Sequence, residues 1–354
     1  MKLSLIIPTY NERDNIRELL LKLKEEFYNN KIDSEIIVVD DGSPDGTGQI
    51  LEELKTEYQN LKVIHREGKL GLSSAVLEGF KITKGDILGV MDADMSHDPQ
   101  KVSELYQVVV NGADFVIGSR YIKGGKIKGW NLYRKFLSKS ATILARVFTD
   151  VMDPMSGFFM IKKELINNKS INPKGFKILL ELLIKTDYKN TVEIPIIFTN
   201  RTLGKSKANI KEIIFYLQNL FSYLPYKKQV IIQFFRFAFV GLIGTVINIA
   251  VLYLFTEHLM IYYIYSAIIA FFIAATFNFI FNKIWTFKEK LNNKISKKYA
   301  KFLVVSLMAL VMNLIFLYIF TEFIKIYYLI SQILAIGISL IINFIGNKIW
   351  TFQK

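Results

Sequence analysis

Four long apolar stretches in the C-terminal third restrict what the chain can fold into. They cover residues 237–256, 261–281, 302–321 and 326–346. Each has about 20 residues, and a helix of that length crosses the ~30 Å hydrocarbon core of a bilayer. A soluble helical bundle would need polar faces that these stretches lack. The sequence therefore predicts a four-helix transmembrane domain over residues 226–354, after a separate domain over residues 1–225.

Lysine and arginine flank these stretches on one side. They precede the first stretch, crowd the 288–301 loop and follow the last stretch, whereas the two opposite loops are poor in them. Such clusters stay in the cytoplasm. We therefore expect a multi-pass protein of the cell membrane with both termini and the N-terminal domain cytoplasmic. The net charge of +14 is explained by this flanking and by anionic lipid, so no nucleic-acid partner is expected. With no cysteine, disulfides and thiolate metal sites are excluded.

The transmembrane region contains an internal repeat. "FNKIWTF" at 281–287 recurs as "GNKIWTF" at 346–352, and half of the positions between 236–287 and 301–352 are identical. An even number of spans per unit predicts two parallel helical-hairpin repeats. Asn248, Asn278, Asn313 and Asn343 lie within the spans. They are interpreted either as interhelix hydrogen-bonding groups or as the lining of a lipid or sugar pathway.

The N-terminal domain alternates strand and helix patterns. Strands are predicted at 3–7, 35–39, 61–65, 87–91 and 115–118, with helices at 14–27, 49–58, 73–80 and 99–110 between them. This order indicates an α/β domain with a mainly parallel sheet. Polar clusters at 8–12, 40–47, 67–75 and 92–99 follow successive strands. Because ligands bind at the carboxyl ends of such strands, these clusters predict one site.

Asp92 and Asp94 follow the buried strand and lie on alternate positions of an extended segment, so they point the same way. Two like charges this close require a cation between them. Oxygen ligands favour Mg²⁺ or Mn²⁺, whose coordination a substrate diphosphate can complete. A solvated turn is the alternative interpretation of an isolated Asp-x-Asp.

Several motifs in order resemble an inverting glycosyltransferase of family 2 with the GT-A fold. They are "SLIIPTYNE", "IIVVDDGSPDGT", "GLSSAVLEGF", "MDADMSHDP", "GSRYIKGG", "SGFFMI" and "RTLGKSK", and they span residues 4–207. The similarity is strongest to the branch that contains dolichyl-phosphate mannose synthases and other polyprenyl-phosphate glycosyltransferases. The C-terminal repeats resemble GtrA-type transmembrane domains.

This resemblance implies a set of donor-binding residues. They are Pro8, Tyr10, Glu12, Val39, Asp41, Asp92, Ala93, Asp94, Arg201 and Lys207. Tyr10 and Asp41 would hold the base, and Arg201 and Lys207 would bind the diphosphate. Asp92 and Asp94 would bind the metal. Ser96 stands where some relatives carry a glutamine ligand, so a water would fill that place.

The resemblance also implies an acceptor-phosphate site made of Arg120, Arg134 and Ser138. Guanidinium groups bind phosphate in a bidentate manner. A lipid monophosphate has a second pKa near ~6 and is largely ionised at neutral pH, so it needs no general base. Asp92, Asp94, Arg120 and Arg134 are therefore the expected catalytic set. His97 is expected to make a structural hydrogen bond.

The function implied is inverting transfer of mannose from GDP-mannose to dolichyl (polyprenyl) phosphate, with Mg²⁺ or Mn²⁺ as cofactor. Trp130 to Phe148 and Glu212 to Leu224 mix basic and aromatic residues, as helices at a membrane surface do. Two alternatives stay open at this stage. One is a UDP-glucose-dependent polyprenyl-phosphate glucosyltransferase. The other is a flippase for lipid-linked sugars with a ligand-sensing cytoplasmic domain.

Overall fold

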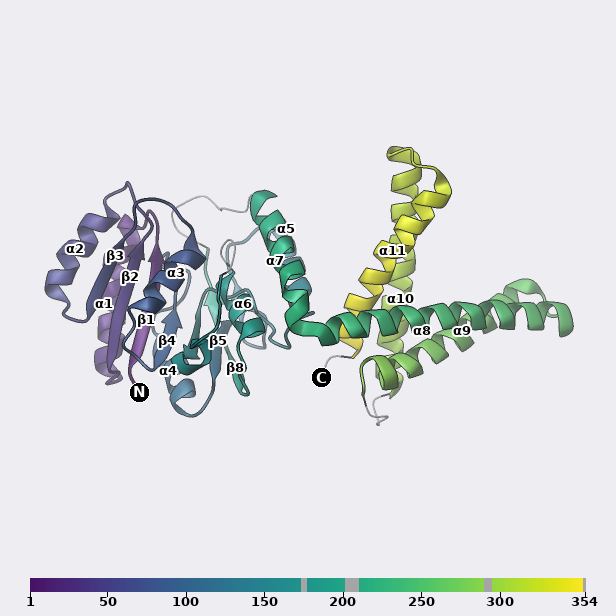
Figure 1. Cartoon of the computed structure of the whole chain (residues 1–354), viewed down its shortest axis with the longest axis horizontal. Coiled ribbons are helices and arrows are strands. Elements are labelled where there is room, and N and C mark those ends of the chain that lie inside the picture. Colours follow the sequence, from purple (N-terminus) through teal and green to yellow (C-terminus); the bar gives the residue numbers. More distant parts are fainter. Residues whose placement is uncertain (173–176, 201–209, 290–294, 353–354) are drawn as a thin grey trace. The chain divides into compact units, whose positions relative to one another are not determined.

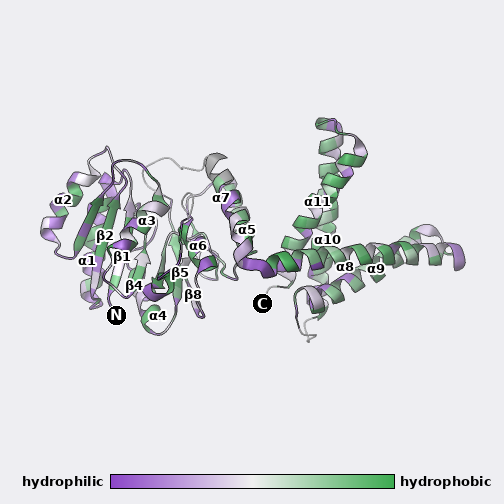
Figure 2. Ribbon diagram, in the orientation of Figure 1, coloured by the Kyte–Doolittle hydropathy of each residue, from purple (hydrophilic) through white to green (hydrophobic). Residues whose placement is uncertain are grey.

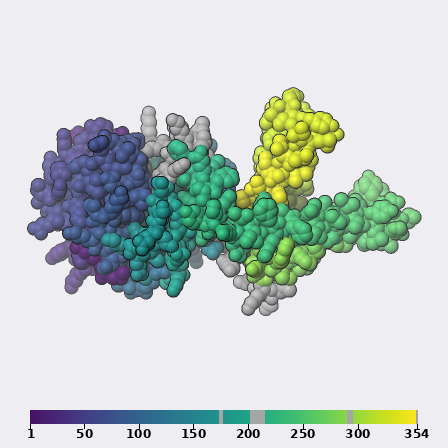
Figure 3. Space-filling model, viewed as in Figure 1, coloured from purple at the N-terminus to yellow at the C-terminus, as the bar shows by residue number. Residues whose placement is uncertain are grey.

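The computed structural model describes residues 1–172, 177–200, 210–289 and 295–352. The chain forms two compact units, Met1–Tyr226 and Lys227–Lys354. In the first unit helices alternate with strands, as the sequence predicts, and in the space-filling view its elements form a continuous body (Figure 3).

The first unit is built on a seven-stranded sheet with the order β3-β2-β1-β4-β7-β5-β8 (Figure 1). Neighbouring strands are parallel except for β7, which runs antiparallel to both β4 and β5. The strands are β1 Leu3–Thr9, β2 Ser34–Asp40, β3 Leu61–His65, β4 Ile87–Val90, β5 Phe115–Ser119, β7 Phe159–Lys162 and β8 Thr191–Pro195. A separate parallel pair joins β6 Lys126–Ile127 to β9 Ile197–Phe198. The predicted mainly parallel sheet is confirmed.

Helices cover both faces of this sheet. They are α1 Arg13–Asn29, α2 Thr47–Glu57, α3 Leu72–Lys81, α4 Lys101–Val110 and α6 Ile178–Lys185. Apolar residues of α1, α2 and α4 pack on one face, and those of α3 and α6 pack on the other. Because both faces are covered, β1 and β2 are buried along their whole length. Because the helices cover the faces, a ligand can reach the sheet only at the polar ends of its strands.

Two further helices end the first unit, α5 Leu132–Ala145 and α7 Ile210–Tyr223. Asn131 caps the start of α5, since its side chain accepts a hydrogen bond from the Arg134 backbone N–H. The Tyr216 hydroxyl donates to the carbonyl oxygen of Ala141 at 2.6 Å, which fastens α7 to α5. Both helices still expose large apolar side chains, with Leu132 83% and Phe221 72% exposed.

The second unit contains four helices that are long and apolar enough to cross a membrane. They are α8 Lys228–Tyr253, α9 Tyr263–Phe281, α10 Ile295–Tyr318 and α11 Tyr328–Gly346, and Figure 2 shows their mostly hydrophobic colouring. Helix α8 packs on α9 and α10 packs on α11. Each helix continues into a π-helical turn of five residues, which begins at equivalent positions in the two repeats.

Six phenylalanines join the two hairpins near these turns. They are Phe237, Phe279, Phe287, Phe302, Phe344 and Phe352. The rings of Phe287 and Phe352, which are equivalent in the two repeats, stack with centroids 4.6 Å apart. Beside them, Glu289 accepts hydrogen bonds from both Lys283 and Lys298 at 2.7 Å. Aromatic packing and one shared carboxylate therefore link the repeats at this end.

The intramembrane asparagines differ in their partners. Gln332 donates to Asn313 at 3.4 Å between α11 and α10. Asn343 instead accepts from Asn347 one turn later on the same chain segment. Asn278 lies against Gly244, where an added Cβ would come within 2.2 Å of its Oδ1 atom. The expected interhelix hydrogen bond is thus observed for Asn313, while Asn278 needs the small residue facing it.

Candidate active site

The strand order predicts a ligand-binding position between β1 and β4. Strands β2 and β3 lie on one side of β1, whereas β4 lies on the other, so the connections diverge at this point. In parallel sheets ligands bind at such a divergence, outside the carboxyl ends of the strands. Tyr10 follows β1, Asp41 follows β2, and Asp92 with Asp94 follows β4.

Asp41 is fixed by a buried cation and two backbone amides. Its Oδ1 accepts from Arg66 Nη1 at 2.6 Å and from the Leu70 N–H at 2.9 Å, and its Oδ2 accepts from the Gly71 N–H at 2.8 Å. Both side chains are about 5% exposed. The loop at 67–71 therefore lies beside the predicted base-binding residues. Nothing local to Arg66 predicts this pairing, because the partners are 25 positions apart.

The other predicted donor-binding residues of this region lie in β1 and β2 or directly after β1. Pro8 and Val39 pair in register in β1 and β2, and both are buried. The ring of Tyr10 is half-buried, and Lys69 Nζ lies 4.1 Å from its centroid. Glu12 accepts from the Asn15 amide at 2.8 Å, which holds it at the start of α1.

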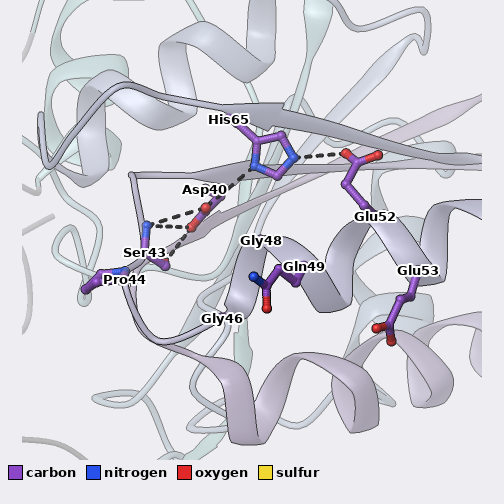
Figure 4. A pocket seen from close by; sticks show the side chains of 9 residues that line it. All are labelled: Asp40, Ser43, Pro44, Gly46, Gly48, Gln49, Glu52, Glu53 and His65. Carbon is purple, nitrogen blue, oxygen red and sulfur yellow. Dashed lines mark hydrogen bonds and ion pairs between the residues drawn. The ribbon is translucent and has the colours of Figure 1, made fainter.

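A different pocket lies at the end of β2 and the start of α2, as Figure 4 shows. Its lining includes Asp40, Glu52, Glu53 and His65. His65 Nε2 lies 2.9 Å from Glu52 Oε1, and its Nδ1 lies 3.6 Å from Asp40 Oδ2. Three acidic side chains would repel a diphosphate. Asp40 and Asp41 are consecutive residues at the end of β2, and consecutive side chains of a strand point to opposite faces of the sheet. This pocket, which Asp40 lines, is therefore on the face opposite to Asp41.

The paired carboxylates lie in a tight turn after β4. Asp94 is 3% exposed, and its Oδ1 accepts from the Ser96 N–H at 3.1 Å. Ala93 between the two aspartates is buried as well. Asp92 lies directly against Gly157, since an added Cβ there would be 2.6 Å from Asp92 Oδ2. The glycine of the "SGFF" motif thus provides the space that the Asp92 carboxylate occupies.

His97 does not make the hydrogen bond expected from the sequence. Its ring is 1% exposed and packs between Phe158 and Phe198, with centroids 5.2 and 5.1 Å away. Within the part of the chain that the structure describes, neither ring nitrogen has a hydrogen-bond partner. Its Nε2 lies 3.4 Å from Asp92 Oδ2. The expectation is wrong because the ring packs between two phenylalanines, and its contact with the Asp92 carboxylate is an ion-pair contact without a hydrogen bond.

The residues at 92–96 fit a hard divalent cation. Asp92 and Asp94 are separated by one residue in the turn after β4, and Asp94 is buried, so a positive charge would offset the cost of its burial. Among residues 1–172, 177–200, 210–289 and 295–352, no group of three His, Cys, Asp or Glu side chains converges on a common point. A cation held by two carboxylates and completed by substrate phosphate and water, as Mg²⁺ commonly is, suits such a site better than Zn²⁺.

Arg120 directly follows β5 and is held by Asp153. Its Nε and Nη2 donate to Asp153 Oδ2 and Oδ1 at 2.7 and 2.8 Å, and its backbone N–H donates to Oδ2 at 2.9 Å. Burial alone would lower the pKa of Arg120, but Asp153 and the nearby charge of Asp92 raise it overall. Arg120 therefore remains charged.

Arg134 and Ser138 lie on α5. The guanidinium of Arg134 is 4.1 Å from the ring centroid of Trp130, and its Nη1 donates to Asn200 Oδ1 at 2.9 Å. Arg120 lies 5.8 Å from the same ring. Ser138 Oγ is hydrogen-bonded to the Tyr121 hydroxyl at 2.9 Å. Trp130 therefore brings the two predicted acceptor arginines to one aromatic side chain. Arg201 and Lys207 lie outside the described residues.

Comparison with known proteins gives matches over both units. Residues 4–168 match the family described as "Glycosyl transferase family 2", and residues 236–352 match "GtrA/DPMS, transmembrane domain". A dolichol-phosphate mannosyltransferase from Pyrococcus furiosus is 40% identical over 352 residues, which is 98% of each chain. Another from Saccharomyces cerevisiae is 41% identical over 227 residues, covering 61% of this chain and 85% of that one.

Among solved structures, glucosyl-3-phosphoglycerate synthase from Mycobacterium tuberculosis, in complex with Mn²⁺, UDP-glucose and phosphoglyceric acid, has a TM-score of 0.47 and 20% identity. The similarity covers 64% of this chain and 79% of that chain. The match to a transmembrane domain, together with the four apolar helices, makes this a multi-pass membrane protein.

Proposed function

Because the chain belongs to the family of dolichol-phosphate mannosyltransferases, we propose that it transfers mannose from GDP-mannose to dolichyl (polyprenyl) phosphate with inversion. The observation that carries the proposal is the placement of two opposed charge systems on the same sheet edge. Two carboxylates, Asp92 and Asp94, follow β4, and the buried Arg120 follows β5, which runs in the same direction as β4.

The donor would bind at the ends of β1, β2 and β4. Tyr10 offers a half-buried ring for the base, and Asp41 offers a carboxylate whose position Arg66 and the 70–71 backbone already fix. Pro8, Val39 and Ala93 would form apolar walls, and Glu12 would lie at the edge. Arg201 and Lys207 are proposed to bind the diphosphate on the strength of the "RTLGKSK" motif alone.

Asp92 and Asp94 would hold Mg²⁺ or Mn²⁺, with Ser96 contributing through a water. The cation would neutralise charge on the nucleoside diphosphate as it leaves. Gly157 keeps Asp92 in place for this, because any larger residue would displace the carboxylate.

The acceptor phosphate would bind on the other side, at Arg120, Arg134 and Ser138. Asp153 occupies the Nε and Nη2 edge of Arg120, which directs Nη1 and the second Nη2 proton away from Asp153. An oxygen of the already ionised lipid phosphate attacks the anomeric carbon, the bond to the diphosphate breaks, and a β-linked mannosyl phosphate results. No proton has to be removed from the nucleophile, so no base is required.

Helices α5 and α7 would lie at the cytoplasmic membrane surface. They expose Leu132, Tyr133, Phe136 and Phe221, each more than two-thirds exposed, beside basic residues. Burial of such side chains in the headgroup region would stabilise docking by about 1.5–3 kcal/mol each when complete. The lipid phosphate could then reach Arg134 on α5 while its polyprenyl chain stays in the bilayer. The lysine-rich segment 288–301 and both termini are proposed to be cytoplasmic.

The test is a transfer assay on the full-length chain in detergent with dolichyl phosphate and Mn²⁺. Radiolabelled GDP-mannose, UDP-glucose and UDP-N-acetylglucosamine are offered in turn. We expect label to enter the lipid only from GDP-mannose. Transfer from UDP-glucose alone would replace the donor assignment, and no transfer from any donor would contradict the proposed function.

A further inference from the structure

Arg120 is fixed on the side of its guanidinium group that faces the protein. Three hydrogen bonds join it to Asp153, whose carboxylate is fully buried. The aromatic rings of Tyr121, Trp130 and Phe198 lie 5.4 to 5.8 Å from its Cζ atom. Rotation of the guanidinium would break the bidentate pair, so the direction of its remaining N–H groups depends on where Asp153 is.

Asp153 lies in a loop rather than in a strand or helix, and a second carboxylate fixes that loop. Glu193 Oε2 accepts from the Met152 N–H at 2.8 Å, and its Oε1 accepts from the Asp153 N–H at 3.0 Å. An ionised carboxylate can accept on both oxygens, whereas a glutamine side chain has only one acceptor oxygen. A carboxylate at position 193 can therefore hold two consecutive amides with one oxygen each, whereas a glutamine offers only one oxygen for both.

The sheet explains why Glu193 reaches this loop. Glu193 is in β8, which pairs in parallel with β5, and it lies opposite Ile117 in the register. Arg120 is three residues after Ile117 and directly follows the end of β5. The same strand pair thus sets both ends of a chain of contacts that runs from Glu193 through the 152–153 backbone and the Asp153 carboxylate to Arg120.

We propose that Glu193 is a positioning residue for the acceptor phosphate, acting through Asp153 on Arg120. The inference rests on the proposed function, which places the lipid phosphate at Arg120. Glu193 itself touches neither substrate. Its loss would loosen Asp153 and let the guanidinium turn away from the acceptor, without altering the donor residues after β1, β2 and β4.

The first experiment is E193Q in the full-length enzyme, with GDP-mannose and dolichyl phosphate varied separately. We expect KM for dolichyl phosphate to rise about tenfold, because one hydrogen bond to a charged group is lost, and KM for GDP-mannose to stay within twofold. The matched control is E104Q on the exposed side of α4, whose carboxylate forms an ion pair with Lys101. Equal rises in both KM values, or no rise for the acceptor, would overturn the proposal.

A double-mutant cycle separates positioning from general loop stability. In an R120K background the bidentate pair with Asp153 cannot form, so E193Q should change the acceptor KM less than twofold there. A further tenfold rise in that background would mean that Glu193 acts by another route and would refute the inference.

Acceptor binding gives a readout that does not depend on transfer. Trp130 is one of three tryptophans, so W285F/W350F leaves it as the only one. Vesicles with dolichyl phosphate should change its fluorescence, and E193Q should need about tenfold more lipid phosphate for half the change. An unchanged midpoint in E193Q would refute the positioning role. Normal binding without any transfer by the wild type would instead count against the proposed function alone.

Discussion

Replacing Gly157 by alanine tests whether the Asp92 carboxylate must occupy its observed position. Gly157 precedes β7 and its φ lies outside the left-handed region, so alanine causes no backbone strain. The new Cβ would stand 2.6 Å from Asp92 Oδ2, 3.1 Å from its Cγ and 3.2 Å from its Oδ1. The substitution therefore perturbs Asp92 and leaves its charge intact.

The size of the effect follows from these distances. Ordinary contact begins near 3.4 Å, so the separation from Oδ2 must grow by about 0.8 Å. Metal–ligand distances tolerate only about 0.2 Å, and a misplacement of about 1 Å in a catalytic group can cost about 100-fold in rate. We expect kcat/KM to fall between about tenfold and 100-fold, which is about 1.4–2.7 kcal/mol in the barrier.

The assay is mannosyl transfer as a function of Mn²⁺ concentration. G157A should shift half-maximal activation to higher Mn²⁺ and lower the maximum. The control is G337A in α11, where an added Cβ meets no atom within 4 Å. G337A should show the Mn²⁺ dependence of the wild type. If G157A showed it as well, the idea that Gly157 sets the position of a metal-binding Asp92 would be refuted.

Three further predictions concern ionised groups. Burial raises the pKa of Glu35, but hydrogen bonds from Lys62, Ser4 and the Lys84 backbone lower it overall from 4.5 to about 2. Glu35 should thus contribute about 3 kcal/mol of stability above about pH 4.5 that is lost as pH falls towards about 2, so the Tm gap between wild type and E35Q should shrink on acidification. R66M should leave the buried Asp41 carboxylate without its cation and lower the free energy of unfolding by about 3–5 kcal/mol. The Tm should fall and GDP should bind more weakly, whereas an unchanged Tm would contradict this prediction. E289Q should remove the carboxylate shared by Lys283 and Lys298 and lower the Tm in detergent, whereas an equal or higher Tm would show that the link does not stabilise the repeats.

Much of the fold follows from local pattern. The helix predicted at 14–27 buries Ile16, Leu19, Leu20, Leu23 and Phe27, because apolar residues at helical spacing face the sheet. The four apolar stretches form four long helices, as predicted, because their length and apolar composition are themselves visible in the sequence. Strand β7 was not predicted, because four residues that insert antiparallel between β4 and β5 carry no pattern of their own.

In the candidate site, the sequence locates the functional residues but not the residues that hold them. Position after a buried strand locates Asp92 and Asp94, and motif similarity locates Arg120 and Arg134. The partners that hold these groups come from distant parts of the chain. Glu193 lies 40 residues from Asp153, and Asn200 lies 66 residues from Arg134. Such pairings depend on how strands meet in the sheet, which residue spacing does not encode.

Asp92 and Asp94 are proposed to hold a divalent cation that binds the donor diphosphate, and the proposed reaction depends on this cation. Titration calorimetry of GDP into the full-length protein, with Mn²⁺ or with EDTA, tests this most directly. We predict that EDTA weakens GDP binding by at least about tenfold and that D94N with Mn²⁺ binds no better than the wild type in EDTA. Equal GDP affinity in Mn²⁺ and EDTA for the wild type would contradict the account.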